Sequence, residues 1–137
     1  MERVLILCTG NSARSQMAEG LLRHLAGDRF EVRSAGSKPG SVRPEAIAVL
    51  KEIGIDISGN RSKHVDEFSG ESFDYVLTVC DNAAESCPIY PGHANRSHHS
   101  FDDPAAVQGP EEVRLGAFRR VRDEIREYLG GFPPAGK

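Results

Sequence analysis

The sequence predicts a single α/β domain in which a four-stranded parallel sheet is flanked by helices. Short apolar runs alternate with segments whose apolar residues recur at helical spacing, which is the pattern of a parallel sheet with crossover helices. The chain has 137 residues, of which 39% are hydrophobic and 27% charged, as expected for one globular domain. We therefore place one domain at residues 1–130 and a loose tail, rich in glycine and proline, at residues 131–137.

The four strands are placed where apolar residues cluster between turn-forming residues. They cover residues 3–7, 30–35, 75–79 and, more weakly, 95–101. In a parallel sheet the carboxyl ends of the strands share one edge, where ligands of such folds bind. Cys8 and Cys80 follow the first and third strands, so the two thiols can meet if these strands are neighbours.

Three helices are expected between and after the strands. Residues 15–25 carry an apolar face that includes Leu25, and a second helix runs from Pro44 to a left-handed cap at Gly54. The connection at residues 56–68 is polar and leaves room for a short helix. The last helix begins near Pro110 and is expected to bury a stripe of five side chains, Val113, Ala117, Val121, Ile125 and Leu129.

Composition excludes several classes of function. A formal net charge of -3 argues against a general nucleic-acid surface, so an anionic ligand has to be held by local geometry. The longest apolar run is far too short to span a membrane, and the N-terminus lacks the pattern of a signal peptide. Three cysteines are an odd number, which argues against a secretory disulfide framework. We expect a cytoplasmic monomer that binds neither membrane nor nucleic acid.

The most informative segment is residues 8–15, CTGNSARS, directly behind the first strand. Its first cysteine, Cys8, and Arg14 are separated by five small or polar residues. A loop of this length can curl so that its backbone N–H groups point inward, and the helix that follows adds its N-terminus, which makes a nest for a tetrahedral oxyanion. The helix N-terminus and Arg14 both favour the thiolate form of Cys8. The alternative is that Cys8 is a small buried hydrophobe at a strand end.

Asp102-Asp103-Pro104 is the second candidate for catalysis. An aspartate before proline is held in an extended or turn conformation, and a carboxylic acid on such a loop can reach the anion site to protonate a leaving oxygen. Read in isolation, the pair is also typical of a turn or helix cap. The loop at residues 8–15 favours the catalytic interpretation.

Cys80 and Cys87 are separated by six residues, too many for a C-x2-C metal site or redox motif. If the segment between them were helical, their Cα atoms would lie about 10 Å apart, beyond the limit of about 7 Å for an unstrained disulfide. Pairing would require the segment to unwind, and with Pro88 behind it the helix is short and weak. Two unrelated buried thiols are the alternative. The five histidines form no ligand spacing, so we expect no metal site.

With these residues in place, the chain resembles the thioredoxin-coupled arsenate reductases built on the low-molecular-weight tyrosine phosphatase fold. The resemblance spans nearly the whole chain. It rests on the segment from Cys8 to Ser15, Ser34-Ala35-Gly36, Gly54-Ile55-Asp56-Ile57-Ser58, Cys80, Cys87-Pro88, Phe101-Asp102-Asp103-Pro104-Ala105 and Arg120-Val121-Arg122-Asp123-Glu124-Ile125. It implies a flavodoxin-like three-layer architecture and a role in arsenical resistance by detoxification.

The resemblance also implies the roles of the site residues. Cys8 is the nucleophile, Ser15 supports its thiolate and Asp103 is the general acid. The oxyanion is bound by Arg14 and the loop amides, that is, by Thr9, Gly10, Asn11, Ser12, Ala13 and Arg14. Cys80 and Cys87 form the redox-active disulfide of a relay that reduces arsenate to arsenite and is restored by thioredoxin. No bound cofactor is implied, and weak phosphatase activity is expected.

Two positions depart from the pattern of some relatives. In members that bind potassium near the anion loop, the matching positions here are Asn11, Glu19, Ser34 and Lys63, and a carboxylate is expected at the last of them. A lysine ammonium cannot ligate a cation, so we expect the ion site to be absent and Lys63 to take its electrostatic role, with a solvent-exposed Lys63 as the alternative. Ala13 replaces a further cysteine that is not part of the relay.

Two other functions compete with arsenate reduction. A low-molecular-weight protein tyrosine phosphatase shares Cys8, the anion loop and the acid, but Ala105 stands where such phosphatases carry an aromatic residue, and Cys80 and Cys87 have no role in hydrolysis. A regulatory oxyanion-binding module without turnover would require Cys8 to be dispensable, which the neighbouring general acid argues against.

Overall fold

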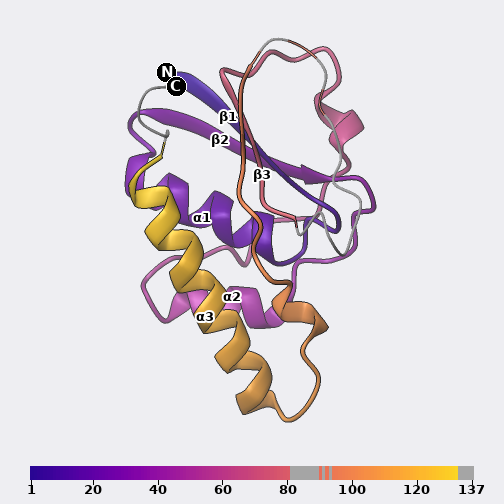
Figure 1. Cartoon of the computed structure of the whole chain (residues 1–137), viewed down its shortest axis with the longest axis vertical. Coiled ribbons are helices and arrows are strands. Elements are labelled where there is room, and N and C mark those ends of the chain that lie inside the picture. Colours follow the sequence, from indigo (N-terminus) through magenta and orange to yellow (C-terminus); the bar gives the residue numbers. More distant parts are fainter. Residues whose placement is uncertain (81–89, 91, 93, 133–137) are drawn as a thin grey trace.

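The computed structural model describes residues 1–80, 90, 92 and 94–132. Four strands form one sheet in the order β2-β1-β3-β4, with every neighbouring pair parallel (Figure 1). The strands are β1 (Glu2–Cys8), β2 (Phe30–Gly36), β3 (Tyr75–Thr78) and β4 (Asn95–His98). The predicted four-stranded parallel α/β fold is confirmed.

The sheet is built around β1, whose last five residues are buried. Val4 pairs with Val32 of β2 on one side and with Tyr75 of β3 on the other. A strand covered on both faces needs apolar residues without alternation, which explains its continuous apolar run. Because β1 and β3 are neighbours, the residues that follow them meet at the same edge of the sheet.

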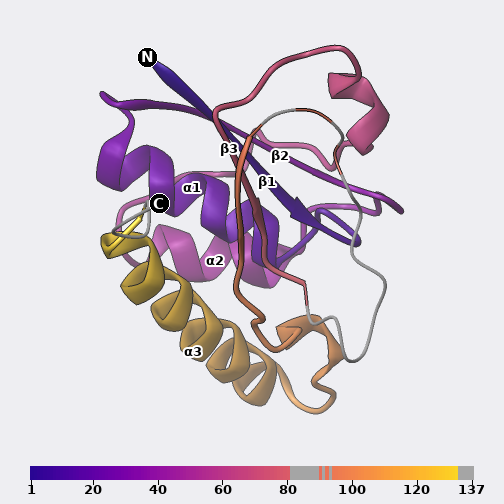
Figure 2. The same cartoon turned by 45° about the horizontal axis from the view of Figure 1, so that its top comes forward.

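The α-helices α1 (Arg14–Ala26), α2 (Pro44–Lys51) and α3 (Glu111–Gly130) gather on one face of the sheet (Figure 2). There they enclose the larger core with Val4, Ile6 and Leu77. The opposite face carries a smaller core to which the 3-10 helix η1 (Val65–Phe68) contributes. A second 3-10 helix, η2 (Pro104–Ala106), precedes α3. None of the helices in the described ranges has the length and hydropathy that crossing a membrane requires.

Several details differ from the sequence prediction. Leu25 and Val113 are 45% and 52% exposed, because they lie in the last turn of α1 and the first turn of α3, at the ends of the packed face. Phe118 is fully buried on α3 and fills the core in place of Val113. The fourth strand ends at His98 and not at residue 101.

The end of the packed chain also differs from the prediction. Phe132, which the composition places in the loose tail, is buried and contacts the rings of Phe30 and Tyr75 edge-on. The packed chain therefore extends at least to residue 132. Residues 133–137 and the short helix expected after Cys80 lie outside the described residues.

Candidate functional site

A small pocket opens at the carboxyl end of β1. Its volume is about 160 Å³, and it is lined by Cys8, Thr9, Gly10, Ser12, Ala13, Arg14 and Asp103. Pockets for drug-sized ligands measure about 300–1,000 Å³, so this one suits a small oxyanion better than a bulky substrate. Cys8 is a free thiol, 2% exposed, at the point where β1 ends.

The carbonyl groups of the loop between β1 and α1 are turned away from the pocket. Backbone N–H groups donate to them at 2.9 to 3.1 Å in the pairs Lys38 to Thr9, Gly40 to Gly10, Arg43 to Ser12 and Met17 to Ala13. The Ser62 hydroxyl donates to the Asn11 carbonyl at 2.7 Å. In a planar trans peptide the C=O and the next N–H point in opposite directions. The N–H groups of residues 10–14 are therefore directed inward, as the sequence predicts for an oxyanion nest.

Asn11 fixes the shape of this loop from beneath. It is fully buried and adopts φ 48°, a left-handed conformation that asparagine tolerates better than most residues. Its Nδ2 donates to Ser15 Oγ at 2.8 Å and to Ser34 Oγ at 2.9 Å, and its Oδ1 accepts from the Lys63 N–H at 2.8 Å. Asn11 therefore holds the loop through its side chain, while its neighbours line the pocket. Ser15, at the start of α1, is buried and receives its hydrogen bond from Asn11.

Arg14 and Asp103 line the pocket with opposite charges. Arg14 is almost fully buried, and its Nη1 donates to the Phe101 carbonyl at 3.2 Å. Its Nη2 lies 3.8 Å from Asp103 Oδ2. Asp103 Oδ1 accepts from the Ala105 N–H at 3.0 Å, so the residue also caps η2. The cap and the catalytic interpretation are compatible, because one carboxyl oxygen caps the helix and the other faces the pocket.

The two adjacent aspartates are separated by their partners. Asp102 Oδ2 pairs with Arg120 of α3 at 3.1 Å, on the exposed side of the loop. Asp103 lines the pocket and Asp102 does not. The geometry therefore favours Asp103 as the acid, which the sequence alone assigns only through the resemblance.

The second cysteine, Cys80, lies at the same edge of the sheet as the end of β1. Cys80 is fully buried just beyond β3, and its Sγ lies 3.9 Å from the carbonyl oxygen of Leu7, the residue before Cys8. The pairing of β1 with β3 produces this approach. Cys87 lies outside the described residues.

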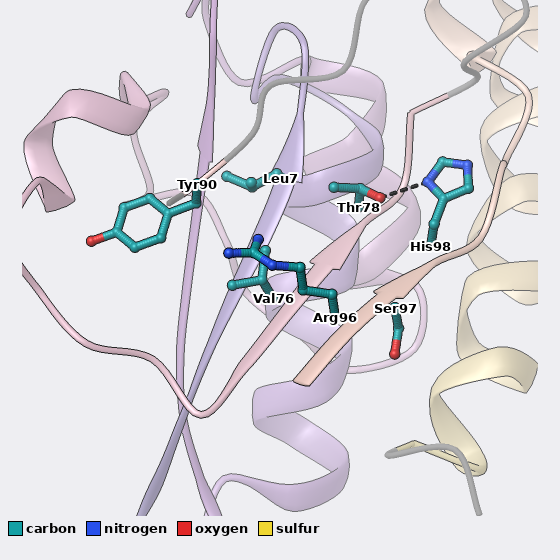
Figure 3. A pocket seen from close by; sticks show the side chains of 7 residues that line it. All are labelled: Leu7, Val76, Thr78, Tyr90, Arg96, Ser97 and His98. Atoms are coloured by element: carbon teal, nitrogen blue, oxygen red, sulfur yellow. Dashed lines mark hydrogen bonds between the residues drawn. The ribbon is translucent and has the colours of Figure 1, made fainter. Parts of the chain in front are cut away.

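A larger hollow of about 380 Å³ lies on the η1 face of the sheet (Figure 3). It is lined by Leu7, Val76, Thr78, Tyr90, Arg96, Ser97 and His98. Thr78 Oγ1 and His98 Nδ1 are hydrogen-bonded at 2.5 Å at one end of it. Its described lining includes none of residues 8–15, so size alone is a poor guide to the reactive site here. Within the described ranges, no cluster of His, Cys, Asp or Glu is arranged to hold a metal ion.

Residues 3–134 match the family described as low molecular weight phosphotyrosine protein phosphatase. The chain belongs to this family. The expectation from the sequence is thus confirmed for the family and its fold. Cys8, the loop that follows it and Asp103 line the same small pocket.

Relatives in this phosphatase family are named arsenate reductases. The chain is 46% identical to the arsenate reductase of Bacillus subtilis (strain 168) over 134 residues, covering 98% of this chain and 96% of that protein. Against the arsenate reductase of Halalkalibacterium halodurans the identity and both coverages are the same.

Solved structures agree with the fold. An arsenate reductase in an oxidized state superimposes with a TM-score of 0.80 at 31% identity, covering 96% of this chain and 95% of that one. A thioredoxin-dependent arsenate reductase of Corynebacterium glutamicum gives a TM-score of 0.67 at 31% identity, covering 96% of this chain and 61% of that one.

The residues matching the potassium site of some relatives form a chain of polar contacts. Ser34 Oγ donates to Glu19 Oε1 at 2.5 Å, and Arg23 pairs with Glu19 Oε2 at 2.9 Å. Lys63 Nζ lies 3.9 Å from Glu19 Oε1. Burial lowers the pKa of Lys63 from its ordinary value, and the charge of Glu19 opposes that shift. The Lys63 ammonium group thus lies next to the Glu19 carboxylate, which matches a potassium ligand of those relatives.

This arrangement predicts that potassium has no specific effect. We expect the native chain to melt at the same temperature in potassium chloride and in sodium chloride of equal ionic strength. Lys63→Asp removes the ammonium and adds a carboxylate, so it should melt higher in potassium than in sodium chloride. Lys51→Asp, a charge change on the exposed end of α2, is the control and should show no difference. A potassium-specific rise in the native chain would contradict the prediction.

Gln16 is a site residue that sequence reasoning missed. It is fully buried in α1, and its Nε2 donates to Asn11 Oδ1 at 3.1 Å and to the Arg61 carbonyl at 3.0 Å. Its Oε1 accepts from Asn60 Nδ2 at 3.1 Å. It therefore ties the anion loop to the connection before η1. A polar residue between buried positions of an amphipathic helix is the signal that could have indicated it.

Proposed function

We propose that this chain reduces arsenate to arsenite through Cys8 and a thiol relay that thioredoxin restores. The observation that carries the proposal is the second sulfur: Cys80 Sγ lies 3.9 Å from the carbonyl oxygen of Leu7, and the next residue, Cys8, lines the oxyanion pocket. Hydrolysis of a phosphate ester needs the pocket but gives no role to Cys80. The names of the relatives support the same activity.

The first step is an attack of the Cys8 thiolate on the arsenic of bound arsenate. The inward N–H groups of the loop and Arg14 stabilise the negative charge on the oxygens, and Asp103 donates the proton with which one oxygen leaves as water. A Cys8–arsenic bond forms and an arsenic–oxygen bond breaks. Arsenic remains in its oxidised state at this point.

The second step transfers the electrons. The Cys80 thiolate attacks the sulfur of Cys8, the electron pair of the sulfur–arsenic bond goes to arsenic, and arsenite leaves with a Cys8–Cys80 disulfide behind it. Cys87 then attacks Cys80, which releases the Cys8 thiolate and leaves a Cys80–Cys87 disulfide. Two thiols are oxidised for each arsenate reduced. The chain needs no bound cofactor, because the dithiol of thioredoxin reduces the final disulfide.

Coupling to thioredoxin is supported by the Corynebacterium glutamicum relative, which is described as thioredoxin-dependent. The small pocket also has to stabilise tetrahedral phosphate, so we expect slow hydrolysis of aryl phosphates. Ala105, next to Pro104 at the start of η2, presents no aromatic wall to a phosphotyrosine ring.

The test follows arsenite release and NADPH oxidation in the presence of thioredoxin and thioredoxin reductase. The native chain should turn over repeatedly. Cys87→Ser should release about one arsenite per chain and stop, because the relay halts at the Cys8–Cys80 disulfide. Cys80→Ser and Cys8→Ser should release none, because the first lacks the attacking thiol and the second lacks the nucleophile.

Two outcomes would contradict the proposal. Sustained turnover by Cys87→Ser would exclude the relay while leaving arsenate reduction in place. Rapid hydrolysis of aryl phosphates by the native chain, without arsenate reduction, would establish a protein tyrosine phosphatase instead.

A further inference from the structure

Three aromatic rings hold the loop that carries Asp103 against α3. His99, exposed just beyond β4, stacks on Phe101 with ring centroids 4.4 Å apart and an interplanar angle of 24°. Tyr128 of α3 lies 4.6 Å from the His99 ring and meets Phe101 edge-on at 6.1 Å. We call His99, Phe101 and Tyr128 the aromatic clamp. The ring of His99 lies close to both of the others, and Phe101, only 3% exposed, is the most buried of the three.

The aromatic clamp is directly linked to Arg14 and Asp103, the two charged residues that line the pocket. The carbonyl of Phe101 accepts the hydrogen bond from Arg14 Nη1 at 3.2 Å. Asp103 follows two residues later, and its Oδ2 lies 3.8 Å from Arg14 Nη2. A movement of Phe101 therefore shifts the acceptor that orients Arg14 and the backbone that carries Asp103 at the same time.

The charged contact between this loop and α3 adds little restraint. The pair of Asp102 with Arg120 joins side chains that are 71% and 50% exposed, and such pairs contribute little. The Tyr128 phenol makes a hydrogen bond with Ser97, and burial raises its pKa above the ordinary value. Phe101 is also buried in the core beside side chains of α3, and since aromatic pairs add stabilisation beyond the area they bury, the rings of His99 and Tyr128 add to that restraint.

We propose that His99 and Tyr128 are positioning residues of the active site. Through Phe101 they fix the Arg14 guanidinium and the Asp103 carboxyl relative to Cys8, although neither lines the pocket. The expected effect on arsenate reduction rests on the proposed function. The expected effect on oxyanion binding does not depend on it.

The test compares truncation of each ring with its replacement by another ring. His99→Ala and Tyr128→Ala remove the stacking, whereas His99→Phe and Tyr128→Phe keep it and remove only the polar atoms. One readout is kcat and KM for arsenate in the coupled assay. The other is the protection of Cys8 from iodoacetamide by inorganic phosphate, measured on the peptide that contains Cys8. This second readout requires no turnover.

Both alanine variants should lose about two- to tenfold in kcat/KM and in phosphate affinity, the effect of one lost aromatic pair. Both phenylalanine variants should stay within about twofold of the native chain. The proposal is overturned if the alanine variants melt at a lower temperature but keep native protection and kcat/KM, since the rings would then be merely structural. It is also overturned if the phenylalanine variants lose as much as the alanine variants. A native chain that reduces no arsenate would contradict the proposed function, and phosphate protection would still decide the role of the clamp.

Discussion

Arg14→Lys is expected to lower kcat/KM for arsenate by about a hundred- to a thousandfold, the usual effect of losing a donor to a developing oxyanion. Lysine keeps the charge but loses the planar fork of donors. In this chain Nη1 of Arg14 is committed to the Phe101 carbonyl and Nη2 faces Asp103, so its orientation depends on both ends of the fork. The coupled arsenate assay measures the loss.

Arg119→Lys provides the matched control. Arg119 uses two of its nitrogens to bind the carboxylate of Glu52, but it lies on the exposed surface of α3. Its variant should stay within about twofold of native activity, because exposed pairs contribute little. A loss below about threefold in Arg14→Lys would mean that charge alone, and not the geometry of the guanidinium, binds the oxyanion.

Gly36→Ala is expected to lower the free energy of unfolding by about 3 kcal/mol and to abolish oxyanion binding. Gly36 ends β2 opposite Cys8, and an added methyl group would overlap the carbonyl oxygen of Thr9 and lie 2.8 Å from that of Cys8. Both obstacles are backbone atoms, so the end of β1 has to move and with it the start of the anion loop. Urea denaturation and phosphate protection of Cys8 measure the two effects.

Gly40→Ala is the control for this substitution. Gly40 donates its N–H to the Gly10 carbonyl of the anion loop, but an added methyl group would meet no atom within 4 Å. It should leave stability and anion binding unchanged. If Gly36→Ala were as well tolerated as Gly40→Ala, the close approach of β2 to the anion loop would have no importance for the site.

The local parts of the fold and site were predictable from the sequence. The apolar run of β1 followed by Cys8 indicates a buried strand that ends at the nucleophile, and the small residues up to Arg14 indicate a loop that can curl around an anion. These features depend on neighbouring residues only. The approach of Cys80 to the end of β1 was expected only on the condition that the first and third strands are neighbours, and the structure shows that they are.

What the sequence could not show are contacts between distant segments. Nothing near Lys38, Gly40 or Ser62 indicates that these residues hold the carbonyls of the anion loop. Gln16 was missed because its four hydrogen bonds join it to three residues, Asn11, Asn60 and Arg61, in two other segments. The exposure of Val113 was missed because helical spacing identifies a face but not where the core beneath it ends.

The outward carbonyls of the anion loop have a consequence for the chain before it is folded. Their partners come from segments around Lys38, Arg43 and Ser62, so the inward ring of N–H groups exists only once at least the first half of the chain has assembled. Until then the carbonyls of residues 9–12 lack these partners, and the N–H groups of the loop have no fixed arrangement around an anion. The oxyanion site is therefore a product of the tertiary structure and not of the loop alone, although every residue that lines it except Asp103 lies within residues 8–14.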